Sequence, residues 1–373
     1  MAETKTRDIP FFNYKGAFAA DEEQFVDIFR DVLRRGAFIQ QRDLADFESN
    51  LATYLGVKHV FGVANATDAL IMAWKAIGLK PGQEVIFPSH TMAASPASVA
   101  HSGGIPVPVD IGDDHLINPA AIESAITPRT VAILPVQLNG RTADMGAIQQ
   151  IADKHNLYIV EDSAQALGSR FDGRFAGTFG LVGVFSFYPA KILGCFGDGG
   201  ALITNDDRIA ERIALLRDHG RDSNGDVVAW GFNSRLDNLQ AAILDYQFKE
   251  YASIISHRRA LAASYDAALH DIPELLLPPP PDADPIHFDV YQNYEIEAER
   301  RDLLREHLKE AGIGTIIQWG GKAIHQFERL GFKVSLPRTD TLFRRALMLP
   351  MNMMVSMDDA EHICEVVRRF YGR

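Results

Sequence analysis

The chain has 373 residues, of which 47% are hydrophobic and 23% charged, values typical of a globular protein with a substantial core. Its 37 basic and 49 acidic residues give a formal net charge of −12, which disfavours non-specific binding to nucleic acid or to an anionic membrane surface. The sequence has no apolar run near the roughly 20 residues of a transmembrane helix, and its first residues, MAETKTRDIPFF, lack the apolar core of a signal peptide.

Between about residues 57 and 204, short β-rich runs alternate with amphipathic stretches such as 67–78 and 144–155, whose apolar residues have helical spacing. This alternation predicts a mostly parallel sheet covered by helices on both faces. Sheets of this kind bind ligands beyond the carboxyl ends of their strands, so we expect the functional residues at that edge. The strand candidates are HVFGVAN (59–65), EVIFP (84–88), IPVPVD (105–110), TVAILPV (130–136), LYIVED (157–162), VGVFSFY (182–188) and ALIT (201–204).

A long helical pattern begins near Ser234 and continues through 236–269. It cannot extend past PPPPDADP (278–285), because successive prolines do not continue a helix. Strand and helix patterns then follow in a smaller block. We therefore predict an α/β fold with two domains: a large domain in residues 1–250 and a small α+β domain in residues 251–373. The segments of the smaller block are VYQNYEIEA (290–298), RDLLREHLKEAG (301–312), GTIIQW (314–319) and DDAEHICEVVRRF (358–370).

Asp162 and Lys191 are predicted to reach the same edge of the sheet. Asp162 closes one strand and is followed by Gln165, whereas Lys191 follows another strand and stands among apolar residues before a run of glycines. Alone, each has a simpler explanation, as a strand-end carboxylate or a loop lysine. A lysine and a carboxylate that meet at a ligand-binding edge raise the odds of a functional site.

A third element is the turn NATDAL (65–70), which runs from strand into helix. Backbone N–H groups at a helix start, with Thr67 beside them, suit a phosphate, although an ordinary helix cap is the alternative. A buried lysine, a carboxylate and a phosphate site together suit pyridoxal phosphate, which forms a Schiff base with lysine and needs an acidic partner for its ring nitrogen. Only two cysteines, scattered histidines and no HExxH or CxxC motif argue against a metal site and fit a reducing cytoplasm.

Three segments resemble motifs of the DegT/StrS family of nucleotide-sugar aminotransferases. The resemblance runs from about Phe38 to Asp245 and continues more weakly through GIGTIIQWGGKAIHQF (312–327) and LMLPM (347–351). It implies a fold-type-I pyridoxal phosphate enzyme that works as a homodimer with shared sites. The segments are SFYPAKILGCFGDGGALITND (186–206), similar to the lysine motif, VEDSAQALGS (160–169), similar to the aspartate motif, and WGFNSRLDNLQAAIL (230–244), similar to the loop that crosses to the other subunit.

The resemblance also implies a role for each matching residue. Lys191 would be the Schiff-base lysine and proton shuttle, Asp162 would keep the pyridine nitrogen protonated, and Gln165 would contact the phenolic oxygen side. Arg235 is a candidate for the carboxylate of the amino donor, since a guanidinium can grip a carboxylate with two hydrogen bonds. An ordinary interface salt bridge explains Arg235 equally well. The phosphate would be held by Ala66, Thr67 and Ser186, and by Asn233 of the other subunit.

The chain departs from the family pattern at three places. Ala66 stands where glycine is usual, so the turn must avoid positive φ. Met92 stands where an aromatic residue usually covers the cofactor ring, a contact that its sulfur can still make. The segment QWGGKAIHQF replaces a tyrosine–proline sequence of many relatives. His325 keeps its place there, which permits a role in substrate binding.

These observations predict a two-stage transamination in which an amino donor, expected to be glutamate, supplies nitrogen to a keto sugar linked to a nucleoside diphosphate. The pattern LGCFGDGG (193–200) is typical of relatives that act on 3-keto sugars; a 4-keto sugar is the alternative. Relatives that dehydrate a sugar have histidine in place of the lysine, and Lys191 argues against that reaction. A non-catalytic sensor or interaction protein on the same fold is the remaining alternative, disfavoured by the intact Lys191, Asp162 and Gln165.

Overall fold

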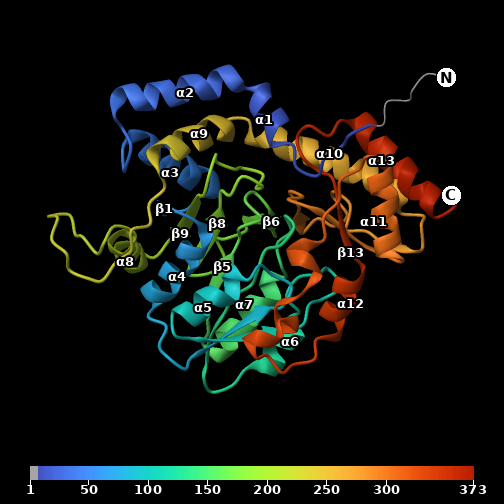
Figure 1. Cartoon of the computed structure of the whole chain (residues 1–373). Helices are drawn as coiled ribbons and strands as arrows, with labels where there is room; N and C mark the ends of the chain where they lie inside the picture. The colour runs from blue at the N-terminus through green and yellow to red at the C-terminus, as the bar shows by residue number, and fades with distance from the viewer. Residues whose placement is uncertain (1–6) are drawn as a thin grey trace.

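The computed structural model describes residues 7–373, so residues 1–6 of the predicted large domain lie outside the described residues. A seven-stranded sheet forms the centre of the molecule (Figure 1). Strands β8, β5, β4, β2 and β3 run parallel to one another, while β9 runs antiparallel to both of its neighbours, β1 and β8. The predicted mostly parallel sheet is therefore confirmed. The strand order is β1 (His59–Val63), β9 (Gly200–Thr204), β8 (Val182–Ser186), β5 (Tyr158–Asp162), β4 (Thr130–Ile133), β2 (Glu84–Pro88) and β3 (Ile105–Val109).

Helix α4 (Ala66–Ile77) illustrates how the sequence produces the helical layers. The Asn65 side chain accepts a hydrogen bond from the Asp68 N–H at 2.8 Å and so caps the start. Gly78 ends the helix in the left-handed conformation, with φ of 83°. Between these ends the apolar residues are buried against the sheet, and the Trp74 indole donates to Ser98 Oγ at 2.9 Å. The other helices that accompany the sheet are α3 (Arg42–Leu55), α5 (Ala94–His101), α6 (Pro119–Ala125), α7 (Met145–His155) and α8 (Asp207–Arg217).

The long helical pattern predicted from Ser234 to residue 269 is two helices, α9 (Asn238–Phe248) and α10 (Tyr251–Leu269). The last turn of α9 tightens, because the N–H groups of Lys249 and Glu250 bond to carbonyls three residues back. The break lets each helix bury its apolar face against a different partner. Helix α9 packs on α3 and on α2 (Glu22–Arg35), whereas α10 packs on α13 (Met357–Phe370). Neither α2 nor α1 (Tyr14–Ala20), at the top of Figure 1, was predicted.

A second sheet and its helices enclose a separate core. Strand β12 (Tyr294–Ala298) lies between β10 (Leu275–Leu276) and β13 (Ala346–Leu349), antiparallel to both. Their apolar residues pack with α10, α13 and α11 (Arg301–Glu310), and Ile9 from the N-terminal segment joins this core. The predicted boundary at 250/251 coincides with the break between α9 and α10 and remains a prediction. The elements not yet named are β6 (Arg170–Phe171), β7 (Arg174–Phe175), β11 (His287–Phe288), α12 (Pro337–Arg345) and short 3-10 turns at Gln318–Gly321, Ile324–Gln326 and Glu328–Leu330.

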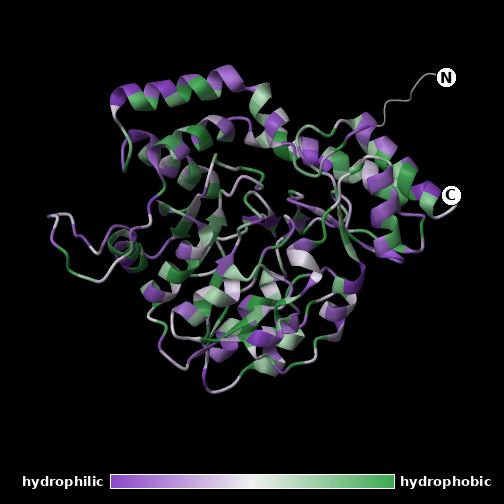
Figure 2. Ribbon diagram, in the orientation of Figure 1, coloured by the Kyte–Doolittle hydropathy of each residue, from purple (hydrophilic) through white to green (hydrophobic). Residues whose placement is uncertain are grey.

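The hydropathy pattern agrees with this layered arrangement. In Figure 2 apolar residues dominate the central strands, whereas the outer helices alternate between apolar and polar faces. At the centre of the large sheet, the buried Glu161 of β5 accepts hydrogen bonds from the N–H groups of Gly177, Phe179 and Gly180 at 2.7–2.8 Å. These bonds fix the loop that enters β8, and they therefore set the position of the two strands whose ends carry the candidate site.

Candidate active site

Asp162 ends strand β5 at the carboxyl edge of the sheet and is only 5% exposed. Its Oδ2 accepts a hydrogen bond from Ser95 Oγ at 2.7 Å, and its Oδ1 accepts one from the Ala164 N–H at 3.2 Å. The Ser95 hydroxyl is in turn 2.7 Å from Thr91 Oγ1, so Thr91 donates to Ser95. The sequence analysis missed Ser95. The one feature of the sequence that points to Ser95 is that it lies, like Met92, between β2 and β3.

Lys191 lies in the turn after β8 and is half-buried. Burial lowers the pKa of Lys191 to about 8, although the charge of Asp162 works in the opposite direction. Burial likewise raises the pKa of Asp162, and the Ser95 hydroxyl, the Ala164 N–H and the charge of Lys191 oppose that shift. The structure thus brings the predicted lysine and carboxylate within electrostatic reach. A lysine with such a pKa is partly neutral near neutral pH and can act as a nucleophile or base.

The residues predicted to hold a phosphate lie where β8, β9 and α4 meet. Ala66 and Thr67 are the first two residues of α4, and among the described residues their N–H groups donate no hydrogen bond. Ala66 is absent from the positive-φ residues, as predicted for a turn with alanine in place of glycine. Gly200 packs against this turn so closely that a Cβ would lie 2.7 Å from the Ala66 nitrogen. One glycine of the run after Lys191 is therefore required by a close backbone approach. Ser186, the last residue of β8, pairs with Gly200 across the sheet.

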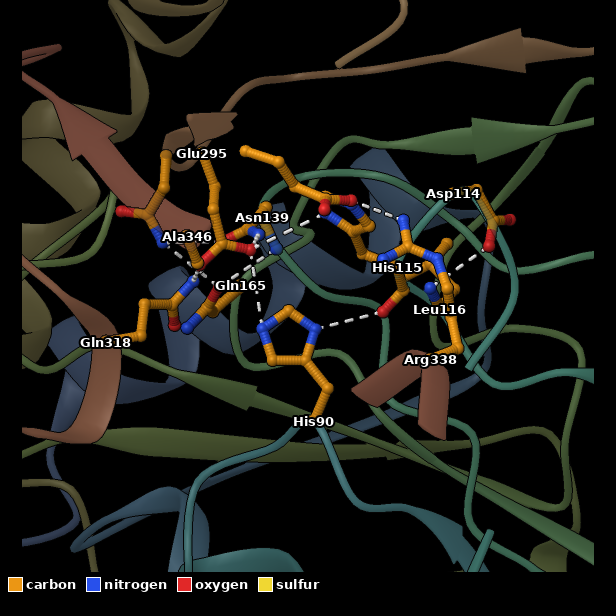
Figure 3. Close-up of polar contacts among 12 residues, drawn as sticks. His90, Asp114, His115, Leu116, Asn139, Gln165, Glu295, Gln318, Arg338 and Ala346 are labelled. Atoms are coloured by element: carbon orange, nitrogen blue, oxygen red, sulfur yellow. Dashed lines mark hydrogen bonds and ion pairs between the residues drawn. The ribbon is translucent and has the colours of Figure 1, made fainter. Parts of the chain in front are cut away.

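Gln165 is held by residues of two connecting segments, one after β4 and one before β12. Its Oε1 accepts hydrogen bonds from the Asn139 N–H at 2.9 Å and from Asn293 Nδ2 at 3.3 Å. Because the amide oxygen is occupied, the amide nitrogen is the group left for a ligand. Asn139 also donates through Nδ2 to Glu295 Oε2 at 3.0 Å, which connects Gln165 to β12 (Figure 3).

Glu295 is the centre of a buried charged cluster that the sequence analysis did not predict (Figure 3). His90 Nε2 lies 3.3 Å from Glu295 Oε2, and Gln318 Nε2 donates to Oε1 at 3.0 Å. Burial alone would raise the pKa of Glu295, but His90, His115 and their hydrogen bonds hold that pKa well below its ordinary value. Burial disfavours the charge on His115, yet Glu295 and Glu297 raise its pKa to about 9. The positive charge of His115 therefore offsets the negative charges of Glu295 and Glu297 where the segments after β2 and β3 meet β12.

The remaining predicted residues have different surroundings. Met92 is exposed after β2, and Asn233 is exposed in the segment before α9. Arg235 Nη1 lies 2.6 Å from Asp218 Oδ1, and Arg235 also donates to the Asn233 side chain. The side chain of His325 is 5% exposed, with Nδ1 2.7 Å from Ser89 Oγ and Nε2 3.1 Å from Asp340 Oδ1. Both ring nitrogens of His325 thus already have partners within the chain.

A cavity of about 910 Å³ borders Lys191. Part of its lining is aromatic and comes from the N-terminal segment, with Phe12 and Tyr14, and from the loop between β8 and β9 that carries Lys191 (187–199, the lysine loop), with Tyr188 and Phe196. Other lining residues come from α10 and from the segment after β13. Asp162, Gln165 and Ser186 do not border the cavity, so it approaches Lys191 from a side that these residues leave free. It is large enough for a small-molecule substrate.

Residues 7–373 contain no group of three or more His, Cys, Asp or Glu side chains arranged to hold a metal ion. No helix among them is both long and apolar enough to span a membrane. Cys195 and Cys364 are buried and unpaired.

A model of the DegT/DnrJ/EryC1/StrS aminotransferase family matches residues 19–368. The chain is 39% identical to the dTDP-3-amino-3,4,6-trideoxy-alpha-D-glucose transaminase of Streptomyces venezuelae, over 100% of this chain and 98% of the relative. The crystal structure of S. venezuelae DesV in complex with a ketimine intermediate superposes with a TM-score of 0.94 at 39% identity, covering 99% of this chain and 100% of that chain. NtdA from Bacillus subtilis, crystallised with bound cofactor PMP, superposes with a TM-score of 0.87 at 28% identity, covering 100% of this chain and 87% of its own.

The burial of Lys191 predicts an unusual pH dependence of its reactivity. When the cofactor-free protein is treated with an amine-reactive reagent over a range of pH, the labelling rate of Lys191, read by peptide mass spectrometry, should reach half its plateau near pH 8. The variant Asp162→Asn should move this midpoint lower, because it removes the charge that stabilises the ammonium. A midpoint near the ordinary lysine value of 10.5 would contradict this description of the site.

Proposed function

The chain belongs to the DegT/DnrJ/EryC1/StrS aminotransferase family and is a nucleotide-sugar aminotransferase; on this premise we propose that it uses pyridoxal phosphate and glutamate to convert a 3-keto sugar nucleotide to the 3-amino sugar. The observation that carries the proposal is that half-buried Lys191 and buried Asp162 lie within electrostatic reach of each other at the sheet edge, together with N–H groups at the start of α4 that donate no hydrogen bond to the described residues.

The residues at the sheet edge fit pyridoxal phosphate in charge and chemistry. The first N–H groups of α4 and the hydroxyls of Thr67 and Ser186 offer donors to a phosphate. Asp162 offers a buried carboxylate to a ring nitrogen, and Lys191 offers an amine with a lowered pKa for a covalent bond. When bound, the cofactor supplies an electron sink for the carbon that loses its proton. PMP in the structure of NtdA supports the same assignment.

The chain's own residues then have distinct tasks. Asp162, oriented by Ser95, holds the proton on the ring nitrogen. Nζ of Lys191 would move the proton, and a pKa near 8 would let it act as base and then as acid near neutral pH. Gln165, whose Oε1 is occupied by Asn139 and Asn293, presents its amide nitrogen as a donor. Met92, exposed in the segment after β2, would cover the cofactor ring.

Two observations support a 3-keto rather than a 4-keto sugar. The strip LGCFGDGG (193–200) has the pattern typical of relatives that act at carbon 3. The S. venezuelae relative, 39% identical over the full chain, is named for a 3-amino sugar.

The loop between α8 and α9 supports a homodimer. It extends away from the rest of the chain at the left of Figure 1 and carries the exposed apolar side chains of Val227, Val228 and Trp230, the last of them 97% exposed. Exposed apolar side chains at the end of a projecting loop are typical of an interface. Asn233 follows in the same segment, fixed by an antiparallel bridge to Asp218, which would let it reach a phosphate in a second copy.

The substrate is tested by offering the holoenzyme 3-keto and 4-keto nucleotide sugars with glutamate and identifying products by mass and NMR. We expect amination at carbon 3, and none with Lys191→Ala, which should keep the wild-type fold by circular dichroism because only the covalent bond and the proton shuttle are lost. Amination at carbon 4 alone would overturn the regiochemistry. Undiminished amination by Lys191→Ala would overturn the mechanism.

The shared site is tested by subunit exchange. Neither Lys191→Ala nor Asn233→Ala should be fully active alone, but a mixture should regain activity, because each heterodimer would contain one site with both residues. The control is a mixture of wild type with the double variant, whose heterodimers contain no complete site. If exchange is demonstrated by mass spectrometry and the two single variants together show only the sum of their separate activities, Asn233 does not act across subunits.

A further inference from the structure

Arg258 on α10 is a buried cation without an anionic partner. It is 7% exposed, and no carboxylate among the described residues forms an ion pair with it. Nη1 donates to the carbonyl oxygens of Tyr291 and Gln292 at 3.0 and 3.1 Å, whereas Nε is enclosed without a partner. Nη2 makes no hydrogen bond with the described residues and is not among the enclosed unpaired atoms. Burial lowers the pKa of Arg258 to about 10, which reflects the cost of this uncompensated charge.

Arg258 is connected to Lys191 through a single residue. Gln292, whose carbonyl accepts from Arg258, clamps the lysine loop with its side chain. Its Nε2 donates to the Ala190 carbonyl at 2.8 Å and its Oε1 accepts from the Ile192 N–H at 2.9 Å, on either side of Lys191. Arg258 and Lys191 also border the same cavity. Both residues therefore line one space.

The charges around the cavity select among anions. Its charged lining residues are Asp21, Lys191, Glu250 and Arg258. With Lys191 bonded to the cofactor in the holoenzyme, a diphosphate would meet two carboxylates and a single guanidinium, which is unfavourable. A single carboxylate matches the one free nitrogen of Arg258, and an amino acid carries that carboxylate next to the amine that would take the place of the Lys191 amine.

We propose that Arg258 binds the carboxylate of the amino donor in the cavity beside Lys191. The inference rests on the proposed transamination but not on the identity of the sugar. It also replaces Arg235 in that role, since Arg235 is already paired with Asp218 at 2.6 Å.

The test compares Arg258→Gln and Arg258→Lys with Arg259→Gln as the matched control. Arg259 is the next residue of the helix, but its guanidinium already pairs with Asp282 at 2.6 Å and lies 4.2 Å from the centroid of the Phe288 ring. Binding of glutarate, a dicarboxylate without the reacting amine, and of thymidine diphosphate to each holoenzyme is measured by calorimetry, and folding is checked by thermal denaturation.

Arg258→Gln should weaken glutarate binding at least about tenfold, the effect of losing a hydrogen bond to a charged group, and leave thymidine diphosphate binding unchanged. Arg259→Gln should bind both ligands as the wild type does. If Arg258→Gln does not fold, Arg258→Lys decides the question: its single nitrogen cannot both satisfy the carbonyls of Tyr291 and Gln292 and reach a ligand, so glutarate binding should again weaken.

Unchanged glutarate affinity in a folded Arg258 variant, or a loss confined to thymidine diphosphate, would overturn the inference. These outcomes are separable from a failure of the proposed function. If the wild type transaminates a nucleotide sugar with glutamate while the Arg258 variants bind glutarate normally, only this inference fails. If the wild type binds glutarate through Arg258 but aminates no nucleotide sugar, the proposed substrate is wrong and the anion site stands.

Discussion

The burial of a carboxylate and an amine at one edge of the parallel sheet is the constraint on which the site depends. Asp162 and Lys191 follow adjacent strands, β5 and β8, so the strand order brings them together. Neither charge is stable alone in such a place. The sheet fixes both positions, since Glu161 holds the loop entering β8 and Ser95 orients the Asp162 carboxylate. The opposed effects of burial and attraction leave Lys191 with a pKa near 8, suited to repeated proton transfer.

The segment that enters β12 ties the second sheet to this site. Within a few residues, Gln292 clamps the lysine loop, Asn293 bonds to Gln165, and Glu295 pairs with His90 at the end of β2. A displacement of this segment would therefore disturb the lysine loop and Gln165 together. The buried contacts of Glu295 with His90, Asn139 and Gln318 hold the same segment in one position.

The sequence predicted the parts of the molecule that depend on local pattern. The strands, the turn at Ala66 and the edge shared by Asp162 and Lys191 follow from periodicity, cap residues and the rule that parallel strands place their carboxyl ends together. The parts that were missed depend on contacts between distant segments. Ser95 and Glu295 look like ordinary polar residues until Asp162 and His90 are placed beside them, and Arg258 resembles the paired Arg259 next to it. No proline or glycine marks the break between α9 and α10 in the sequence. The break arises because the two helices pack on different partners.

The central claim is that Lys191 is the residue to which the cofactor is bound. Reduction of the purified holoenzyme with borohydride would fix the cofactor to its amine, and peptide mass mapping would locate it. We expect one phosphopyridoxyl group per chain, on Lys191, and none on the other lysines. A group located on another lysine, or holoenzyme that retains its cofactor through reduction with Lys191 unmodified, would contradict it.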